Sequence, residues 1–195
     1  EGSYTIKFNG VELVNGREYA HLTATSANGT VNGNVDSMPF QSLTISETGF
    51  PPDQTIINGT FEHDDFESSK GKLLSLIDSY GYENPNGTDP LGYYPEMLAQ
   101  LDHLAEQFIT EFNNLHEQLY TLDGGPNNPS VLGDAFFTGT SASDIKVSDA
   151  ILSDHSKLAA STAENEEGNG QGALDLAGLQ FTGINGLNGA TFQSF

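Results

Sequence analysis

The segment YPEMLAQLDHLAEQFITEFNNLHEQLYTL, residues 94–122, decides how this chain folds. Apolar side chains recur in it at alternating intervals of four and three residues: Tyr94, Leu98, Leu101, Ala105, Phe108, Phe112, Leu115, Leu119 and Leu122. Such heptad spacing keeps one apolar stripe on a single side of an α-helix. Pro95 suits a first helical turn, and Asp123-Gly124-Gly125-Pro126 is typical of a helix end. We expect one long helix over about residues 93–122, about 40 Å long at 1.5 Å per residue.

This stripe predicts a packing surface. We expect a structural packing seam at Leu98, Leu101, Ala105, Phe108, Phe112, Leu115 and Leu119. Met97, Leu104 and Ile109 widen the stripe, which suits a helix packed against two partners rather than a lone two-stranded zipper. A long amphipathic helix is not stable alone, and the other predicted helices are short. Because the chain also opens on Glu1 with no apolar leader, we expect a segment of a longer protein whose further long helices complete a bundle.

Residues 1–68 predict a small antiparallel β domain. Alternating apolar and polar residues flank Asn9-Gly10, and this pair favours a hairpin over residues 4–14 because a type I′ turn needs two positive φ angles. Further short strand candidates, bounded by Gly, Asn, Pro or Asp, are residues 19–25, 41–46 and 55–61. None is continuously apolar, so we expect one face of the sheet to be exposed to solvent.

Residues 69–195 predict a mainly helical, bundle-like rod domain dominated by the long helix. The other helix candidates are short: residues 70–80, which Gly81 ends, 150–160 and 173–179. Ile145-Lys146-Val147 alternates like a strand. The expected fold class is therefore α+β, with an antiparallel β domain followed by the helical part.

The composition excludes several classes of function. The 27 Asp and Glu residues outnumber the 6 Lys and Arg residues, which gives a net charge of −21. A polyanionic surface repels nucleic acid, and docking on an anionic membrane needs basic residues. No apolar run approaches the roughly 20 residues of a membrane-spanning helix. The chain has no cysteine, which excludes a disulfide scaffold and a thiolate metal site.

No motif predicts a catalytic residue, a cofactor or a metal site. A Gly-x-Ser-x-Gly elbow, a phosphate-binding loop and a His-Glu-x-x-His motif are all missing from the sequence. His103 and His116 fall at outward and flanking heptad positions, where we expect solvated side chains. Glu62-His63-Asp64-Asp65 offers four cation ligands, but adjacent residues of a strand point to opposite faces and need a turn to converge. Asn84–Asp89 and Asp123–Asn128 weakly resemble calcium loops but lack the bidentate Glu.

Several segments, in collinear order, resemble the flagellar hook-associated protein 1 family. They are Leu101-Asp102-His103-Leu104-Ala105, Phe112-Asn113-Asn114-Leu115-His116, Tyr120-Thr121-Leu122-Asp123-Gly124, Ala135-Phe136-Phe137, residues 154–161 and residues 168–180. The opening hairpin, residues 2–16, is similar to a further element of that family. Two residues depart from the pattern: Leu119 stands where a small residue is usual, and His155 stands where proline is common.

The resemblance implies a structural component of the bacterial flagellum that joins hook to filament. It implies self-association in a ring through lateral packing, with the hook protein and the second junction protein as neighbours. It also implies an extracellular location after export through the flagellar type III channel, and paired terminal coiled-coil helices outside this chain. The residues leave one alternative from another class, an extracellular adhesin or ligand-binding module carried by residues 1–66.

Overall fold

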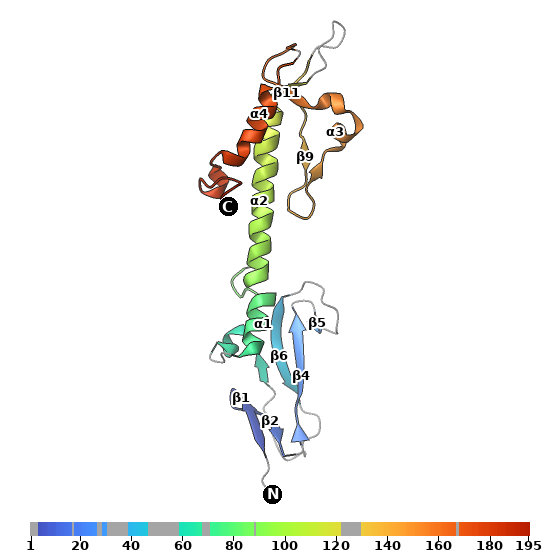
Figure 1. Cartoon of the computed structure of the whole chain (residues 1–195). Coiled ribbons are helices and arrows are strands. Elements are labelled where there is room, and N and C mark those ends of the chain that lie inside the picture. The colour runs from blue at the N-terminus through green and yellow to red at the C-terminus, as the bar shows by residue number, and fades with distance from the viewer. Residues whose placement is uncertain are drawn as a thin grey trace. The chain divides into compact units, whose positions relative to one another are not determined.

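The computed structural model describes residues 4–16, 18–26, 29–30, 39–46, 59–67, 71–87, 89–121, 130–166 and 168–195 (Figure 1). Contacts within the chain divide it into two compact units, Glu1–Met97 and Leu98–Phe195. Small antiparallel sheets and helices together confirm the predicted α+β class. Within the described residues, no helix has both the length and the apolar character needed to span a membrane.

Two antiparallel sheets form the β part of the first unit. One has the strand order β1-β2-β3, and the other has the order β5-β4-β6-β7. The strands are β1 (Thr5–Phe8), β2 (Val11–Asn15), β3 (Glu18–Tyr19), β4 (His21–Ser26), β5 (Gly29–Thr30), β6 (Phe40–Ser46) and β7 (Gly59–Phe61). The longest pairing joins β4 to β6, which lie side by side in Figure 1.

The predicted hairpin over residues 4–14 is confirmed. Asn9 and Gly10 connect β1 to β2 with φ angles of 45° and 84°, the two positive values that a type I′ turn requires. The strands predicted over residues 19–25 and 41–46 are also present, the first interrupted at Ala20. Of the strand predicted over residues 55–61, only β7 falls within the described residues.

Phe66 lies at the centre of the first unit's core. It belongs to the 3₁₀ helix η1 (His63–Phe66) and has no exposed surface. The ring of Phe8 lies 5.2 Å from that of Phe66, and the ring of Phe40 lies 6.0 Å from it, as measured between centroids. The core therefore draws β1, β6 and η1 together around one aromatic side chain.

The helix predicted over residues 70–80 is present as α1 (Lys72–Tyr80) and ends at Gly81, but it belongs to the first unit. Ile77 of α1 is buried in the β core, and Tyr82 packs against the same core. Tyr82 and Leu91 exchange two backbone hydrogen bonds of 2.9 and 3.0 Å. The contacts therefore place the boundary later than the predicted division after residue 68, because these apolar side chains cover the sheets.

Helix α2 (Tyr93–His116) begins where the heptad pattern predicts and has 24 residues, which gives about 36 Å at 1.5 Å per residue. The prediction that it continues to about residue 122 was wrong. After His116 the backbone tightens into a turn, and β8 (Tyr120–Thr121) pairs with β11 (Ala159–Ser161). Leu119 is 3% exposed and packs against Gly172, where a Cβ would lie 2.6 Å from a Leu119 methyl carbon.

The rest of the second unit consists of short elements. They are β9 (Phe137–Thr138), β10 (Lys146–Val147), α3 (Asp149–Ser153), η2 (His155–Lys157), β11, α4 (Gln171–Gly178), η3 (Leu179–Phe181) and η4 (Asn185–Leu187). Strand β10 and helix α4 confirm the predictions for residues 145–147 and 173–179. The helix predicted over residues 150–160 was wrong beyond Ser153. Asp154 accepts a hydrogen bond from the Ser156 N–H and starts η2, and the following residues are taken by the β11–β8 pairing.

The central position of Phe66 predicts a large loss of stability on truncation. Phe66→Ala should lower the free energy of unfolding of the first unit by about 3–5 kcal/mol, because it leaves a cavity beside the rings of Phe8 and Phe40. Chemical denaturation followed by circular dichroism measures the change. Tyr4→Ala, at a side chain that is 84% exposed, is the matched control and should change stability by less than about 0.5 kcal/mol. Equal effects of the two substitutions would contradict this core assignment.

Candidate functional site along helix α2

The structure divides the predicted seam into an open and a covered part. Leu98 and Leu101 are 61% and 48% exposed. Towards the C-terminal end, Ala105, Phe108, Phe112 and Leu115 are half-buried and Leu119 is buried. We call Leu98 and Leu101 the open seam, and Phe108, Phe112, Leu115 and Leu119 the covered seam.

Aromatic rings cover the second half of α2. The ring of Phe108 lies 5.7 Å from that of Phe112, 5.3 Å from that of Phe137 and 5.4 Å from that of Phe192. Phe112 lies 5.0 Å from both Phe136 and Phe137. Tilted and edge-to-face ring pairs each add about 0.5–1.5 kcal/mol to the stabilisation from burial. The cluster therefore fixes strand β9 and the C-terminal segment on the helix.

Asn113 holds the paired phenylalanines by their backbone. Its Oδ1 accepts hydrogen bonds of 2.9 Å from the N–H groups of Phe136 and Phe137, and its Nδ2 donates to the Phe137 carbonyl at 2.9 Å. One amide side chain thus satisfies three backbone groups of a neighbouring segment. This role could not be predicted from the sequence, because an asparagine at a helical position carries no signal of its long-range partner.

His116 is a core residue, which corrects the expectation of a solvated side chain. It is 1% exposed; its Nδ1 lies 2.7 Å from the Asp134 carbonyl oxygen, and its Nε2 accepts from the Ala159 N–H at 3.0 Å. A carbonyl requires a donor, and an N–H requires an acceptor, so these partners select the neutral imidazole protonated on Nδ1. The ring is therefore used to join α2 to β11.

His103 is exposed as predicted but is not without a partner. Its Nε2 lies 2.8 Å from the carbonyl oxygen of Gly186, which belongs to η4. The contact attaches the segment around η4 to the outer face of α2. His103 and His116 therefore both join α2 to other segments of the second unit.

An apolar cavity of about 290 Å³ adjoins the open seam. The side chains that line it include Leu101, Leu104, Phe108, Ile145 and Phe192. Its wall at Ile145 belongs to the loop between β9 and β10. The cavity thus lies between α2, this loop and the C-terminal segment. It adjoins the part of the seam that the described residues do not fully cover.

The loop that forms this wall is ordered by two carboxylates. Asp144 Oδ1 accepts hydrogen bonds from the N–H groups of Thr140 and Ser141, at 2.9 and 2.7 Å, and from the Ser141 hydroxyl. The Thr140 N–H and the Ser141 groups lower the pKa of Asp144, because each bond favours the ionised carboxylate. Asp102 Oδ1 accepts from the Ala142 N–H at 2.9 Å and fastens the loop to α2.

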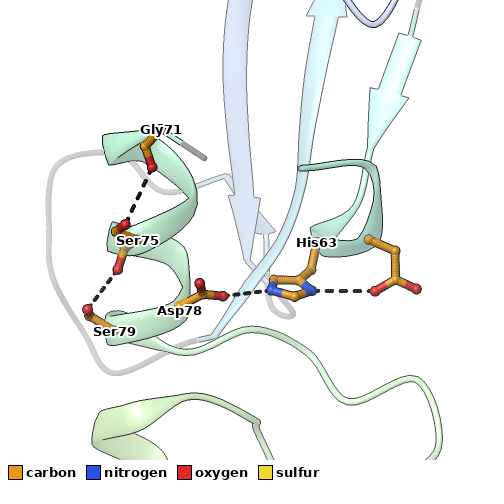
Figure 2. A network of polar contacts seen from close by, with 6 residues as sticks. His63, Gly71, Ser75, Asp78 and Ser79 are labelled. Carbon is orange, nitrogen blue, oxygen red and sulfur yellow. Dashed lines mark hydrogen bonds and ion pairs between the residues drawn. The ribbon is translucent and has the colours of Figure 1, made fainter. Parts of the chain in front are cut away.

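A second polar cluster lies in the first unit around His63 (Figure 2). Figure 2 shows the His63 ring directed at Asp78 of α1. The ring Nε2 lies 2.8 Å from Asp78 Oδ1, and the ring Nδ1 lies 3.4 Å from Asp64 Oδ1. The ring also stacks on Tyr82 at 3.5 Å between centroids. Burial raises the pKa of the Tyr82 phenol, and the negative charges of Asp78 and Asp64 raise it further. The cluster fastens η1 to α1.

The segment Glu62–Asp65 is not a strand. Glu62 caps the 3₁₀ helix η1, so the four side chains lie on a turn. Even so, in the part of the chain that the structure describes, no group of three or more His, Asp or Glu side chains is placed to hold a metal ion. In Asn84–Asp89, the Asn84 side chain accepts from the Asn86 N–H and makes a local turn. The other segment with a weak resemblance to a calcium loop, Asp123–Asn128, lies outside the described residues.

The second unit is therefore a helical domain. Short segments of this unit cover the apolar seam at the C-terminal end of α2 and leave it open at Leu98 and Leu101. The sequence profile named "Flagellar hook-associated protein FlgK helical domain" matches residues 1–137, and the chain belongs to this family. This confirms the resemblance found in the sequence.

A relative from Bacillus subtilis (strain 168), flagellar hook-associated protein 1, is 38% identical over 115 residues. These residues are 55% of this chain and 21% of the relative, so the chain spans about a fifth of that protein's length. No solved structure matches the chain.

The two parts of the seam should respond differently to the same substitution. Phe108→Asp should unfold the second unit at a cost of several kcal/mol, because it places an unpaired carboxylate among aromatic rings. Leu98→Asp is the matched control at an exposed position and should leave the melting curve nearly unchanged. Circular dichroism during thermal unfolding measures both variants. An unaltered melting curve for Phe108→Asp would remove the packing assignment.

The two hydrogen bonds of His116 predict a further effect on stability. His116→Leu retains an apolar volume but leaves the Asp134 carbonyl and the Ala159 N–H without their partner, at about 1–3 kcal/mol for each buried group. His155→Leu, at an exposed histidine, should have little effect. Denaturant unfolding compares the two variants, and similar midpoints would show that His116 contributes no specific bonds.

Proposed function

We propose that this chain is part of a structural component of the bacterial flagellum that joins hook to filament. The observation that supports it most directly is the match of residues 1–137 to the hook-associated helical domain. The partly open apolar seam of α2 fits a protein that acts by packing against neighbours. We further propose that the subunits form a ring held by lateral packing.

The proposed partners are further copies of the same protein, the hook protein and the second junction protein. The proposed location is outside the cell, after passage through the flagellar type III export channel. The absence of cysteine is compatible with export as an unfolded chain, and the net charge of −21 favours solubility. Both features support the proposal.

We also propose that the chain has no catalytic role. His116 uses both ring nitrogens for bonds to backbone groups, and His103 binds the carbonyl of Gly186. In this arrangement the histidines of α2 hold segments together. The residues of the seam, Leu98 to Leu119, serve packing in the same proposal.

Deletion of the gene tests the proposed junction. Cells without the protein should assemble hooks but release filament subunits into the medium, because the filament has no surface on which to grow. Electron microscopy of hooks and immunoblotting of the medium measure the two outcomes, with a strain complemented by the wild-type gene as control. Normal filaments, or loss of the hooks themselves, would contradict the junction assignment.

A cavity in the first unit favours one alternative function, a ligand-binding module. This cavity of about 460 Å³ is lined by polar side chains that include Gln41, Thr60, His63, Tyr82 and Glu83. Calorimetric titration with calcium and with glycans separates the two functions. The structural proposal expects no saturable heat, whereas a saturable signal that Tyr82→Ala removes would support the alternative.

A further inference from the structure

We propose that the Asn86-Gly87 pair is a site of spontaneous deamidation, which replaces the side-chain amide of Asn86 with a carboxylate while the first unit stays folded. The sequence contains nine Asn-Gly pairs, and glycine favours this reaction because it has no Cβ to shield its backbone nitrogen. The inference concerns the chemistry of the chain alone and is independent of the proposed junction function. The structure describes both residues of six pairs: Asn9-Gly10, Asn15-Gly16, Asn86-Gly87, Asn169-Gly170, Asn185-Gly186 and Asn188-Gly189.

The reaction requires free movement of the asparagine side chain and of the glycine backbone nitrogen. Hydroxide from the solvent removes the proton of the Gly87 amide, and this nitrogen attacks Cγ of Asn86. A bond between these two atoms forms, the bond from Cγ to Nδ2 breaks, and Nδ2 takes a proton from water and leaves as ammonia. The resulting succinimide ring takes up water and opens to aspartate or isoaspartate. A hydrogen bond that holds either reacting group must therefore open first.

Hydrogen bonds of the asparagine side chain restrain two of the pairs. Asn169 Nδ2 donates to Thr162 Oγ1 at 3.2 Å and to Glu166 Oε2 at 2.8 Å. Its Oδ1 accepts a third hydrogen bond from a backbone N–H. Asn9 Nδ2 donates to the Asp65 carbonyl at 2.7 Å. The amide group that must be attacked is therefore fixed in both pairs.

The backbone restrains three further pairs. The N–H groups of Gly16 and Gly189 each donate a hydrogen bond of 2.9 Å to a backbone carbonyl. Asn185 and Gly186 belong to the 3₁₀ helix η4, which His103 fastens to α2. The nitrogen that must attack is therefore held by its own bond or by the conformation of its segment.

The Asn86-Gly87 pair has neither kind of restraint. Asn86 is exposed, and its side-chain amide has no hydrogen-bond partner among the described residues. The Gly87 N–H donates to the Asn84 carbonyl at 3.4 Å, which is longer than the usual range for such bonds. The remaining bond of the turn, from the Asn86 N–H to Asn84 Oδ1, involves neither reacting group. This pair therefore combines a free side chain with a weakly held nitrogen.

Backbone pairing fixes the ends of the loop that carries Asn86. The Glu83 N–H donates to the Phe40 carbonyl at 2.8 Å, and Tyr82 and Leu91 exchange two hydrogen bonds. None of these groups belongs to the reacting pair. The product therefore gains a negative charge, and the longer backbone of isoaspartate is accommodated between ends that stay in place.

Ageing of the intact wild-type chain in neutral buffer tests the proposal. Mass spectrometry of its peptides at successive times measures aspartate and isoaspartate at each described pair, and a zero-time sample corrects for deamidation during digestion. Asn86 should react at least about tenfold faster than Asn169, because each ordinary hydrogen bond that must open slows the step by about two- to tenfold. In the chain unfolded by urea, this difference should largely disappear.

Variants separate the two restraints. Gly87→Ala should slow deamidation of Asn86, because a methyl group then crowds the attacking nitrogen. Thr162→Val combined with Glu166→Ala removes both acceptors of Asn169 Nδ2. This double variant should speed deamidation of Asn169 and leave Asn86 unchanged, and its two altered side chains are exposed, so the fold should be kept.

Equal rates at Asn86 and Asn169 in the folded chain would overturn the proposal. So would a preference for Asn86 that persists unchanged in urea, since the local sequence and not the structure would then set the rate. The aged product, separated by ion exchange, should keep the wild-type melting curve. An aged product that is unfolded would contradict a modification that the first unit tolerates.

Discussion

The second unit depends on the burial of aromatic side chains against one half of helix α2. The rings of Phe108 and Phe112 pack against those of Phe136, Phe137 and Phe192, which belong to later segments of the chain. Short strands and single-turn helices do not hold their positions alone, because they have few backbone bonds of their own. Their placement therefore depends on the helix. The hydrogen bonds of Asn113 and His116 then fix which backbone groups of these segments lie against α2.

The sequence predicts the fold well where local signals agree with tertiary packing. Asn9-Gly10 determines its hairpin because the turn needs positive φ angles, and the heptad spacing marks α2 from its first residue. Prediction failed where long-range pairing overrides helix propensity. The segment after His116 continues the heptad pattern, yet its backbone groups bond to β11 and Leu119 is buried against Gly172. Such partners are not visible in a local window.

The residues that form the candidate site could be predicted from the sequence, but the extent to which each is buried could not. Heptad spacing identifies Leu98, Leu101 and Phe108 as one stripe, and it gives each the same expectation of burial. Coverage depends on where distant rings such as Phe192 fall, which no spacing encodes. His116 shows the same limit for polar residues. A flanking heptad position suggests solvent, whereas the buried ring lies between two backbone groups from other segments.

The apolar seam and the net charge of −21 act over different distances. Apolar contact requires heavy atoms within about 4 Å. Repulsion between carboxylates extends over the Debye length, about 8 Å at physiological ionic strength. A like-charged neighbour meets this barrier before the seam contributes, unless salt shortens the range. A neighbour of opposite charge is attracted first and then gains the apolar contact.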